Sequence, residues 1–167
     1  MLVPHDMNGQ AIGVLGLGGS GIAAVAALRA AGAHVFAFDD VKSQHDIPEI
    51  LMTSWQEWPW QNLDAMVISP GIPHHHPKPH PAAALATSLN IDVISEVELA
   101  LRAKPAAPLV VITGTNGKST TTALIGHCLK FAGRAVAIGG NLGDPASSLD
   151  DPGTDGVLVL ELSSYQL

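Results

Sequence analysis

Two glycine-rich turns, each placed between a hydrophobic run and a helix-like stretch, constrain the fold of this chain most strongly. The first reads Gly16-Leu-Gly-Gly-Ser-Gly21 and follows residues 11–15, and the second reads Gly114-Thr-Asn-Gly-Lys-Ser-Thr120 and follows residues 109–113. Glycines at a strand-to-helix turn permit a tight backbone and let a phosphate approach the amides at the helix start. The sequence therefore predicts an α/β protein with a nucleotide-type turn in each half.

The alternation of short apolar runs with alanine-rich stretches predicts parallel sheets in which strands and helices follow one another. Residues 104–108, Lys-Pro-Ala-Ala-Pro, interrupt this alternation and are the best linker candidate. We therefore expect a Rossmann-like domain over 1–103, a linker over 104–108, and the incomplete first part of a second domain over 109–167, with only about three strands. The expected strands are 11–15, 34–38, 65–69, 91–94, 109–113, 135–138 and 156–162, and the expected helices are 21–31, 81–89, 96–102 and 119–132.

Composition favours a globular protein and excludes several classes of function. A hydrophobic content of 47% suits a buried core, and a net charge of −7 argues against a nucleic-acid-binding surface, which needs clustered Lys and Arg. The single cysteine, Cys128, excludes an internal disulfide and lies in an apolar helical run, so we expect it to be buried. With no signal peptide and no apolar run near the ~20 residues that span a membrane, a cytoplasmic protein is expected.

The second turn predicts a phosphate-binding loop for ATP with magnesium. Lys118 places a positive charge near the β- and γ-phosphates, and the Ser119 hydroxyl can bind Mg²⁺. Ile112 stands where the pattern G-x-x-x-x-G-K-[ST] has its first glycine, so Gly114 gives a shorter loop. Glu161 ends a hydrophobic run beside this loop and is expected to be a second magnesium ligand. The predicted ATP-binding residues are Gly114, Thr115, Asn116, Gly117, Lys118, Ser119 and Thr120; Lys118 and Glu161 are the predicted catalytic residues, and Ser119 and Glu161 the predicted metal ligands.

The first turn matches G-x-G-x-x-G, and the acidic Asp39 follows near the ~20-residue spacing expected of a ribose-binding carboxylate. Alone, this unit would indicate a nucleotide-dependent oxidoreductase, and that alternative stays open beside a non-catalytic nucleotide-binding module. The histidines at 74–76 and His80 alternate with prolines, which predicts an extended, solvated loop rather than a metal site.

Several segments together resemble the Mur ligases of peptidoglycan synthesis, and they cover nearly the whole chain in order. These segments are Ser69-Pro-Gly-Ile72, Gly114-Thr-Asn-Gly-Lys-Ser-Thr-Thr121, Gly140-Asn-Leu-Gly143 and Leu160-Glu-Leu-Ser-Ser-Tyr-Gln-Leu167. The resemblance implies a Rossmann-like N-terminal domain followed by the truncated start of a P-loop-type central domain. It also implies an ATP-dependent, amide-bond-forming ligase that requires Mg²⁺.

The first turn and Asn116 fit best the branch of this family whose substrates are UDP-N-acetylmuramoyl-L-alanine and D-glutamate. The resemblance implies that a substrate carboxylate attacks the γ-phosphate to give an acyl phosphate, which the amine of D-glutamate then displaces. It also implies that further catalytic residues lie beyond Leu167, so residues 1–167 alone are expected to have no ligase activity. Val41 and Lys42 stand where the family would have an arginine in the uracil site. The residues implied to bind the UDP substrate are Gly19, Ser20, Asp39, Asp40, Gly71, Asn141, Ser163 and Gln166.

Overall fold

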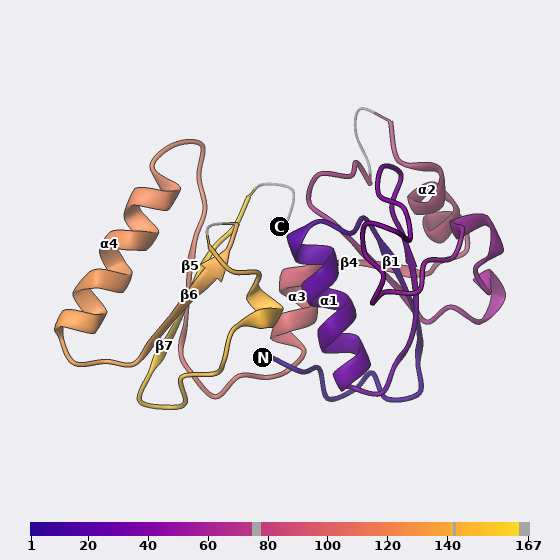
Figure 1. Cartoon of the computed structure of the whole chain (residues 1–167). Helices are drawn as coiled ribbons and strands as arrows, with labels where there is room; N and C mark the ends of the chain where they lie inside the picture. The colour runs from indigo at the N-terminus through magenta and orange to yellow at the C-terminus, as the bar shows by residue number, and fades with distance from the viewer. Residues whose placement is uncertain (75–77, 142, 164–167) are drawn as a thin grey trace.

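Two parallel sheets organise the chain in the computed structural model, which describes residues 1–74, 78–141 and 143–163 (Figure 1). The first sheet has the strand order β2-β1-β3-β4 and the second the order β5-β7-β6. The predicted α/β class with parallel sheets is confirmed. The strands are β1 (Ala11–Leu15), β2 (His34–Phe38), β3 (Ala65–Ile68), β4 (Asp92–Ser95), β5 (Leu109–Ile112), β6 (Val136–Gly140) and β7 (Val157–Glu161). The helices are α1 (Gly19–Ala30), α2 (Pro81–Ser88), α3 (Glu96–Leu101) and α4 (Lys118–Phe131), with 3₁₀ turns η1 (Trp55–Glu57), η2 (Trp60–Asn62) and η3 (Ala146–Ser148).

The predicted strands and helices are all present, and their ends differ by at most two residues from those expected. Helix α1 begins at Gly19 rather than at residue 21, so Ser20 belongs to its first turn. Strand β6 runs on to Gly140, where its register pairs it with Glu161 of β7. Pairing with a neighbouring strand extends β6 past the apolar run that predicted it. Among the described residues, no helix is long and apolar enough to cross a membrane.

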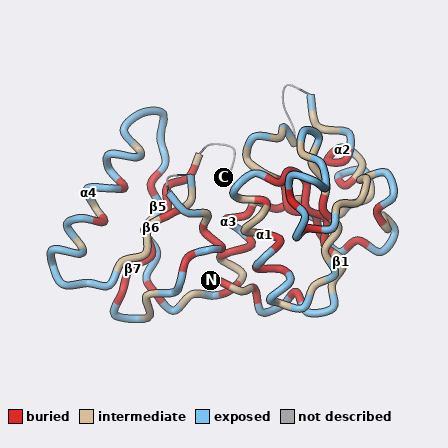
Figure 2. Tube along the Cα trace, in the orientation of Figure 1, coloured by how far each residue is buried: buried red, intermediate tan, exposed pale blue. Residues whose placement is uncertain are grey.

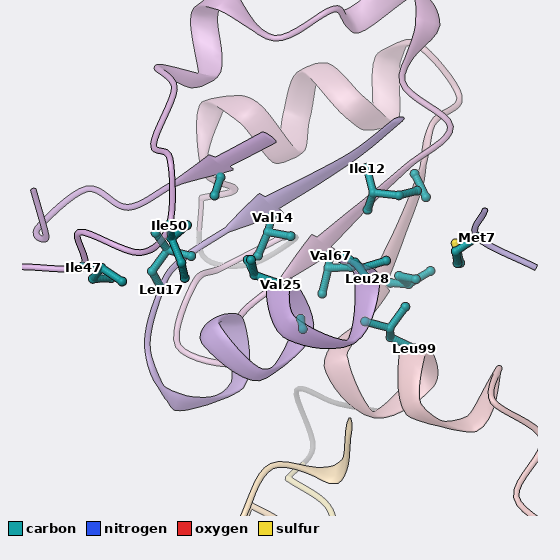
Figure 3. Close-up of a cluster of buried hydrophobic side chains, with 14 residues drawn as sticks. Met7, Ile12, Val14, Leu17, Val25, Leu28, Ile47, Ile50, Val67 and Leu99 are labelled. Atoms are coloured by element: carbon teal, nitrogen blue, oxygen red, sulfur yellow. The ribbon is translucent and has the colours of Figure 1, made fainter. Parts of the chain in front are cut away.

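Helices cover both faces of the first sheet because the side chains of β1 alternate between them. Ile12 and Val14 point into a core with Val25 and Leu28 of α1 (Figure 3). Leu15 points to the opposite face, where a second core contains the buried alanines of α2 and Trp58. This alternation has the period of two residues that a strand imposes, and it fixes which face each helix covers.

The first glycine turn depends on glycine for space as well as for conformation. Gly16 has a φ of +88°, a conformation that only glycine adopts freely. Gly21 lies so close to the turn that a Cβ atom there would be 1.8 Å from the Gly16 carbonyl oxygen. The strand β1 and the helix α1 can therefore approach each other only if residue 21 has no side chain.

We expect Gly21→Ala to lower the free energy of unfolding by about 3 kcal/mol, because the backbone must move to relieve this contact. Urea denaturation followed by circular dichroism measures the change. Gly18→Ala is the matched control, since Gly18 has a φ of −69° and no atom within 4 Å of an added Cβ. Equal stabilities for the two variants would contradict the steric account of this turn.

We call residues 1–103, with the first sheet, the first unit, and residues 109–167, with the second sheet, the second unit. Strand β7 joins these two units because its two faces pack against different parts of the chain. Val157 and Val159 pack with side chains of α4, whereas Leu158 and Leu160 lie in a core shared with Val97 of α3. Every residue of β7 is buried, while much of α4 is exposed (Figure 2).

Cys128 corrects an expectation, because its thiol is exposed and not buried. The buried residues of α4 are Thr122 and Gly126, four positions apart on the face toward the sheet. Cys128 is two residues beyond Gly126 and therefore lies off that face.

A polar contact also joins the units, at Ser147 of η3. The carboxylate oxygen Oε1 of Glu96, in α3, accepts hydrogen bonds from the amide and the hydroxyl of Ser147, both at 2.5 Å. The Ser147 carbonyl accepts a third bond, from the Leu2 amide at 3.0 Å. Glu96 and Ser147 are 1% and 0% exposed. Burial raises the pKa of the Glu96 carboxyl above the ordinary value of 4.5, although the bonds from Ser147 oppose this change.

The raised pKa gives Glu96 a defined effect on the pH dependence of stability. The folded state holds the Glu96 proton more tightly than the unfolded state, so this contribution is complete below pH 4.5 and is lost as the pH rises through the raised pKa. We expect the free energy of unfolding of the wild type, minus that of Glu96→Gln, to fall as the pH rises from 4.5 through the raised pKa. Chemical denaturation of both proteins over this pH range measures the difference. A difference that stays constant or grows would contradict the expectation.

Candidate functional site

A polar pocket of about 350 Å³ lies at the carboxyl ends of the strands in the second sheet. The loop after β5, the residue after β6 and the last residue of β7 meet there, because parallel strands end at a common edge of the sheet. This position is where α/β proteins bind ligands. The lining residues are Thr115, Asn116, Gly117, Lys118, Ser119, Thr120, Asn141 and Glu161.

The loop before α4 presents backbone amides to this pocket. Gly114 and Gly117 have φ values of +141° and +77°, and Gly117 caps the helix in the left-handed conformation. Among the described residues, no side chain caps the first turn of α4, and that turn contains no acidic residue. The amides of this turn and the positive end of the helix dipole therefore favour an anion at this position.

Lys118 lies in the first turn of α4, and its side chain folds back over the loop. Its Nζ atom donates a hydrogen bond to the Gly114 carbonyl at 2.7 Å. The ammonium group is thus held at the loop that precedes α4, and Lys118 lines the pocket. Ser119 and Thr120 follow in the same turn, with exposed side chains that line the pocket.

Glu161 is the most unusual group in the pocket, because its carboxylate is buried and only half satisfied. The residue is 1% exposed, and its Oε1 atom accepts a hydrogen bond from Asn141 Nδ2 at 3.0 Å. The Oε2 atom is buried and has no hydrogen-bond partner among the described residues. Since an uncompensated buried carboxylate costs several kcal/mol, the arrangement suits a cation bound at Oε2. Carboxylate and hydroxyl oxygens are the ligands that Mg²⁺ prefers, so Glu161 and Ser119 fit that ion.

Asn141 is tied to Glu161 by its backbone as well as by its side chain. Its amide donates to the Glu161 carbonyl at 2.8 Å. Gly140, just before it, has a φ of +98°, and a Cβ there would be 2.4 Å from the same carbonyl oxygen. The glycine allows the chain to turn so closely over the end of β7 that Asn141 reaches the carboxylate. The sequence associated Asn141 with the substrate but did not reveal this bond.

The residues expected to bind the UDP portion lie at the carboxyl edge of the first sheet. Gly19 and Ser20 begin α1, Asp39 and Asp40 follow β2, and Gly71 follows β3. The strand order reverses between β1 and β3, and such a switch point is the usual ligand position of an open α/β sheet. These residues do not line the pocket of the second unit.

Asp39 holds the first glycine turn in place. One carboxylate oxygen accepts from the Leu17 amide at 2.6 Å, and the other accepts from the amides of Val41 and Lys42 at 2.9 and 2.8 Å. Burial favours the neutral acid, but these bonds together outweigh it and hold the pKa of Asp39 below its ordinary value. Lys42 Nζ donates to the Leu17 carbonyl at 2.6 Å, so Lys42 also stabilises the turn.

His80 corrects a second expectation, because it is not part of a solvated loop. Its side chain is 12% exposed, its Nδ1 atom accepts from the Ala82 amide at the start of α2, and its Nε2 atom lies 3.2 Å from a carboxylate oxygen of Asp40. Because Nδ1 accepts a hydrogen bond, Nε2 carries the ring proton and donates a hydrogen bond to Asp40. The sequence could not reveal this pair, since the two residues are forty positions apart.

The other expected substrate residues lie beyond β7. Ser163 follows Leu162, whose amide donates to the Ile112 carbonyl at 2.9 Å and so keeps the chain beside β5. Gln166 lies outside the described residues. Ser69 is a residue whose role the sequence did not reveal: its hydroxyl donates to the Gly16 carbonyl at 2.9 Å and joins the ends of β1 and β3.

Comparison with known proteins agrees with this architecture. Residues 112–167, which contain the pocket described above, match the family described as "Mur ligase middle domain", so this segment of the chain belongs to that family.

Among its relatives, the chain is 45% identical to the UDP-N-acetylmuramoylalanine–D-glutamate ligases of Rhodopseudomonas palustris (strain HaA2) and Rhodospirillum rubrum. These matches cover 100% and 99% of the chain. The corresponding ligase of Paramagnetospirillum magneticum is 46% identical over 96% of the chain. The chain spans only 37% of the length of the first two relatives.

A solved structure also resembles the fold. It is the UDP-N-acetylmuramate:L-alanyl-gamma-D-glutamyl-meso-diaminopimelate ligase from Neisseria meningitides, with a TM-score of 0.53 at 18% identity. The match covers 92% of this chain and 52% of that one. At this level of identity the likeness concerns the fold alone.

Proposed function

We propose that this chain supplies the UDP-substrate unit and the ATP site of a ligase that adds D-glutamate to UDP-N-acetylmuramoyl-L-alanine. The observation that carries the proposal is the buried carboxylate of Glu161, whose Oε2 atom has no hydrogen-bond partner in the described part of the chain, beside a glycine loop at the start of α4. This pairing fits a nucleoside triphosphate with a divalent cation. The names of the relatives that align with the full chain supply the reaction and its substrates.

In the proposed reaction the pocket binds the phosphates of ATP. The amides of Thr115, Asn116 and Gly117 and the Lys118 ammonium would contact the phosphate oxygens, with Thr120 at the edge of the same pocket. Ser119 and Glu161 would hold Mg²⁺, which supplies positive charge that neutralises the transferring phosphoryl group. Catalysis of phosphoryl transfer depends mainly on such charge and on positioning.

The first unit would hold the uridine nucleotide of the second substrate. The residues proposed for this role surround the switch point of the first sheet, and Asn141, Ser163 and Gln166 would contact the muramoyl-alanine end. The alanyl carboxylate attacks the γ-phosphorus and the bond from that phosphorus to the β–γ bridging oxygen breaks, so ADP leaves and an acyl phosphate forms. The D-glutamate amine then attacks the acyl carbon, phosphate leaves with its bonding electron pair, and the nitrogen loses a proton to solvent as the amide forms.

The test is phosphate release by the complete gene product that contains this chain. We expect release from Mg-ATP only when UDP-N-acetylmuramoyl-L-alanine and D-glutamate are both present. Omission of either one is the internal control, and replacement of D-glutamate by L-glutamate tests stereospecificity. Tight binding of NADH or NADPH together with no such dependence would favour the oxidoreductase alternative. ATP binding without turnover under all conditions would favour a non-catalytic nucleotide-binding module.

A further inference from the structure

The contact between Glu96 and Ser147 has a place in the fold that packing alone does not require. All the polar groups of Ser147 are bonded by residues of the first unit: its amide and hydroxyl by Glu96, and its carbonyl by Leu2. The surrounding core is apolar and includes Val97 and Leu160. An apolar pair would fill this position without the desolvation cost of a carboxylate, and Glu96 Oε2 has no hydrogen-bond partner among the described residues. The Glu96 carboxylate therefore fixes the position of Ser147 more than it contributes to the free energy of unfolding.

The turn η3, to which Glu96 is hydrogen-bonded, is close in sequence to residues of the candidate ATP pocket. The turn η3 follows residues 143–145, and the Gly140 amide donates to the Asp144 carbonyl at 2.9 Å. This bond closes a short loop of the chain between β6 and η3. The loop contains Asn141, whose side chain donates a hydrogen bond to Glu161. A displacement of η3 would therefore be transmitted to Asn141, which is expected to contact the muramoyl-alanine end of the UDP substrate.

The same segment also lies beside the first glycine turn. A Cβ atom on Gly19, at the start of α1, would be 4.0 Å from the Pro145 ring. Residues 143–145 thus lie between the helix start expected to hold the UDP substrate and the pocket expected to hold ATP. The Glu96 bonds fix η3, at one end of this segment, against the first unit.

We propose that Glu96 is a positioning residue for the ligase reaction, and that its bonds to Ser147 hold Asn141 and residues 143–145 in register with the unit that binds the UDP substrate. This inference rests on the proposed function. It concerns a residue that touches neither substrate and acts only through Ser147. Because Glu96 bonds η3 to the unit expected to bind the UDP substrate, its loss should change kcat/KM for that substrate more than the KM for ATP.

Steady-state kinetics of the complete gene product test this role with Glu96→Ala, Glu96→Gln and the matched control Glu98→Gln. Glu98 lies on the same helix, is exposed, and pairs with Arg102. For Glu96→Ala we expect kcat/KM for the UDP substrate to fall about tenfold or more, with the KM for ATP changed less than about twofold. Glu96→Gln should recover most of the loss, because its amide oxygen still accepts both Ser147 bonds. Glu98→Gln should match the wild type.

A merely structural role would give a different pattern. The kcat of Glu96→Ala would then fall in proportion to the folded fraction, with both KM values unchanged, and that result would overturn the proposal. If Glu96→Ala fails to fold, Ser147→Ala and Glu96→Gln carry the same comparison, because Ser147→Ala removes only the hydroxyl donor.

Amide hydrogen exchange separates this inference from the proposed function. We expect peptides covering residues 143–149 to exchange faster in Glu96→Ala than in the wild type or Glu98→Gln, whether or not the protein is a ligase. Exchange equal to that of the wild type would refute the positioning role. Absence of phosphate release that depends on both substrates in the wild type would instead refute the proposed function and leave the exchange result interpretable.

Discussion

Lys118→Ala is expected to reduce ATP-dependent turnover by on the order of a thousandfold, because it removes the positive charge that the pocket places beside the transferring phosphate. Lys118 lines the pocket, with its Nζ atom 2.7 Å from the Gly114 carbonyl. Removing it leaves the helix start in place but lowers the positive potential at the pocket. Phosphate release under saturating substrates measures the change in kcat, and titration of Mg-ATP measures the change in affinity.

Lys130→Ala is the matched control for this variant. Lys130 is an exposed lysine in the last turn of the same helix and has no place in the pocket. Its loss changes the net charge of the protein equally, so it should leave turnover within about twofold of the wild type. If the two lysine variants lost activity to the same extent, the local role of Lys118 would be refuted.

Glu161→Gln is expected to lower turnover by about a hundredfold and to raise the Mg²⁺ concentration needed for half-maximal activity. The substitution keeps an oxygen that can accept the Asn141 bond but removes the charge that a cation requires. Because the wild-type carboxylate is buried and one of its oxygens has no hydrogen-bond partner among the residues that the structure describes, the free energy of unfolding without Mg²⁺ should not fall by more than about 1 kcal/mol. Activity and stability should therefore separate at this residue.

Thermal unfolding with and without Mg-ATP gives an independent reading of the same site. The wild type should be stabilised by the ligand, and Glu161→Gln should lose most of that stabilisation. Asp155→Asn is the control, since Asp155 is exposed in the loop just before β7. Equal stabilisation of Glu161→Gln and the wild type by Mg-ATP would show that Glu161 does not hold the metal.

Local patterns predicted the parts of the fold that local forces determine. The period-two alternation of β1 and the glycines at the two turns are properties of short segments, so their elements are at the expected places. The grouping of Lys118 and Glu161 at one sheet edge followed from the rule that parallel strands share their carboxyl end. Their roles with ATP and Mg²⁺ remain predictions.

Contacts between distant segments could not be predicted in the same way. The bond from Asn141 to Glu161 depends on the register of β6 against β7, and no pattern in either strand specifies that register. In the sequence, Glu96 resembles a solvated residue at the start of a helix. The fold brings Ser147 into hydrogen-bond contact with it, and no local pattern indicates that contact. Cys128 was expected in the core because its run is apolar, yet only one narrow face of α4 meets the sheet.

The two-sided packing of β7 also limits how such proteins can be recombined. Leu158 and Leu160 are matched to α3, and Val157 and Val159 are matched to α4. A chimera joined at the predicted linker, residues 104–108, would therefore place β7 of one parent against α3 of the other. Segments exchanged between homologues should give a folded chimera only when α3, the N-terminal segment at Leu2 and β7 come from the same parent. The smallest exchangeable part of the protein is therefore larger than either sheet.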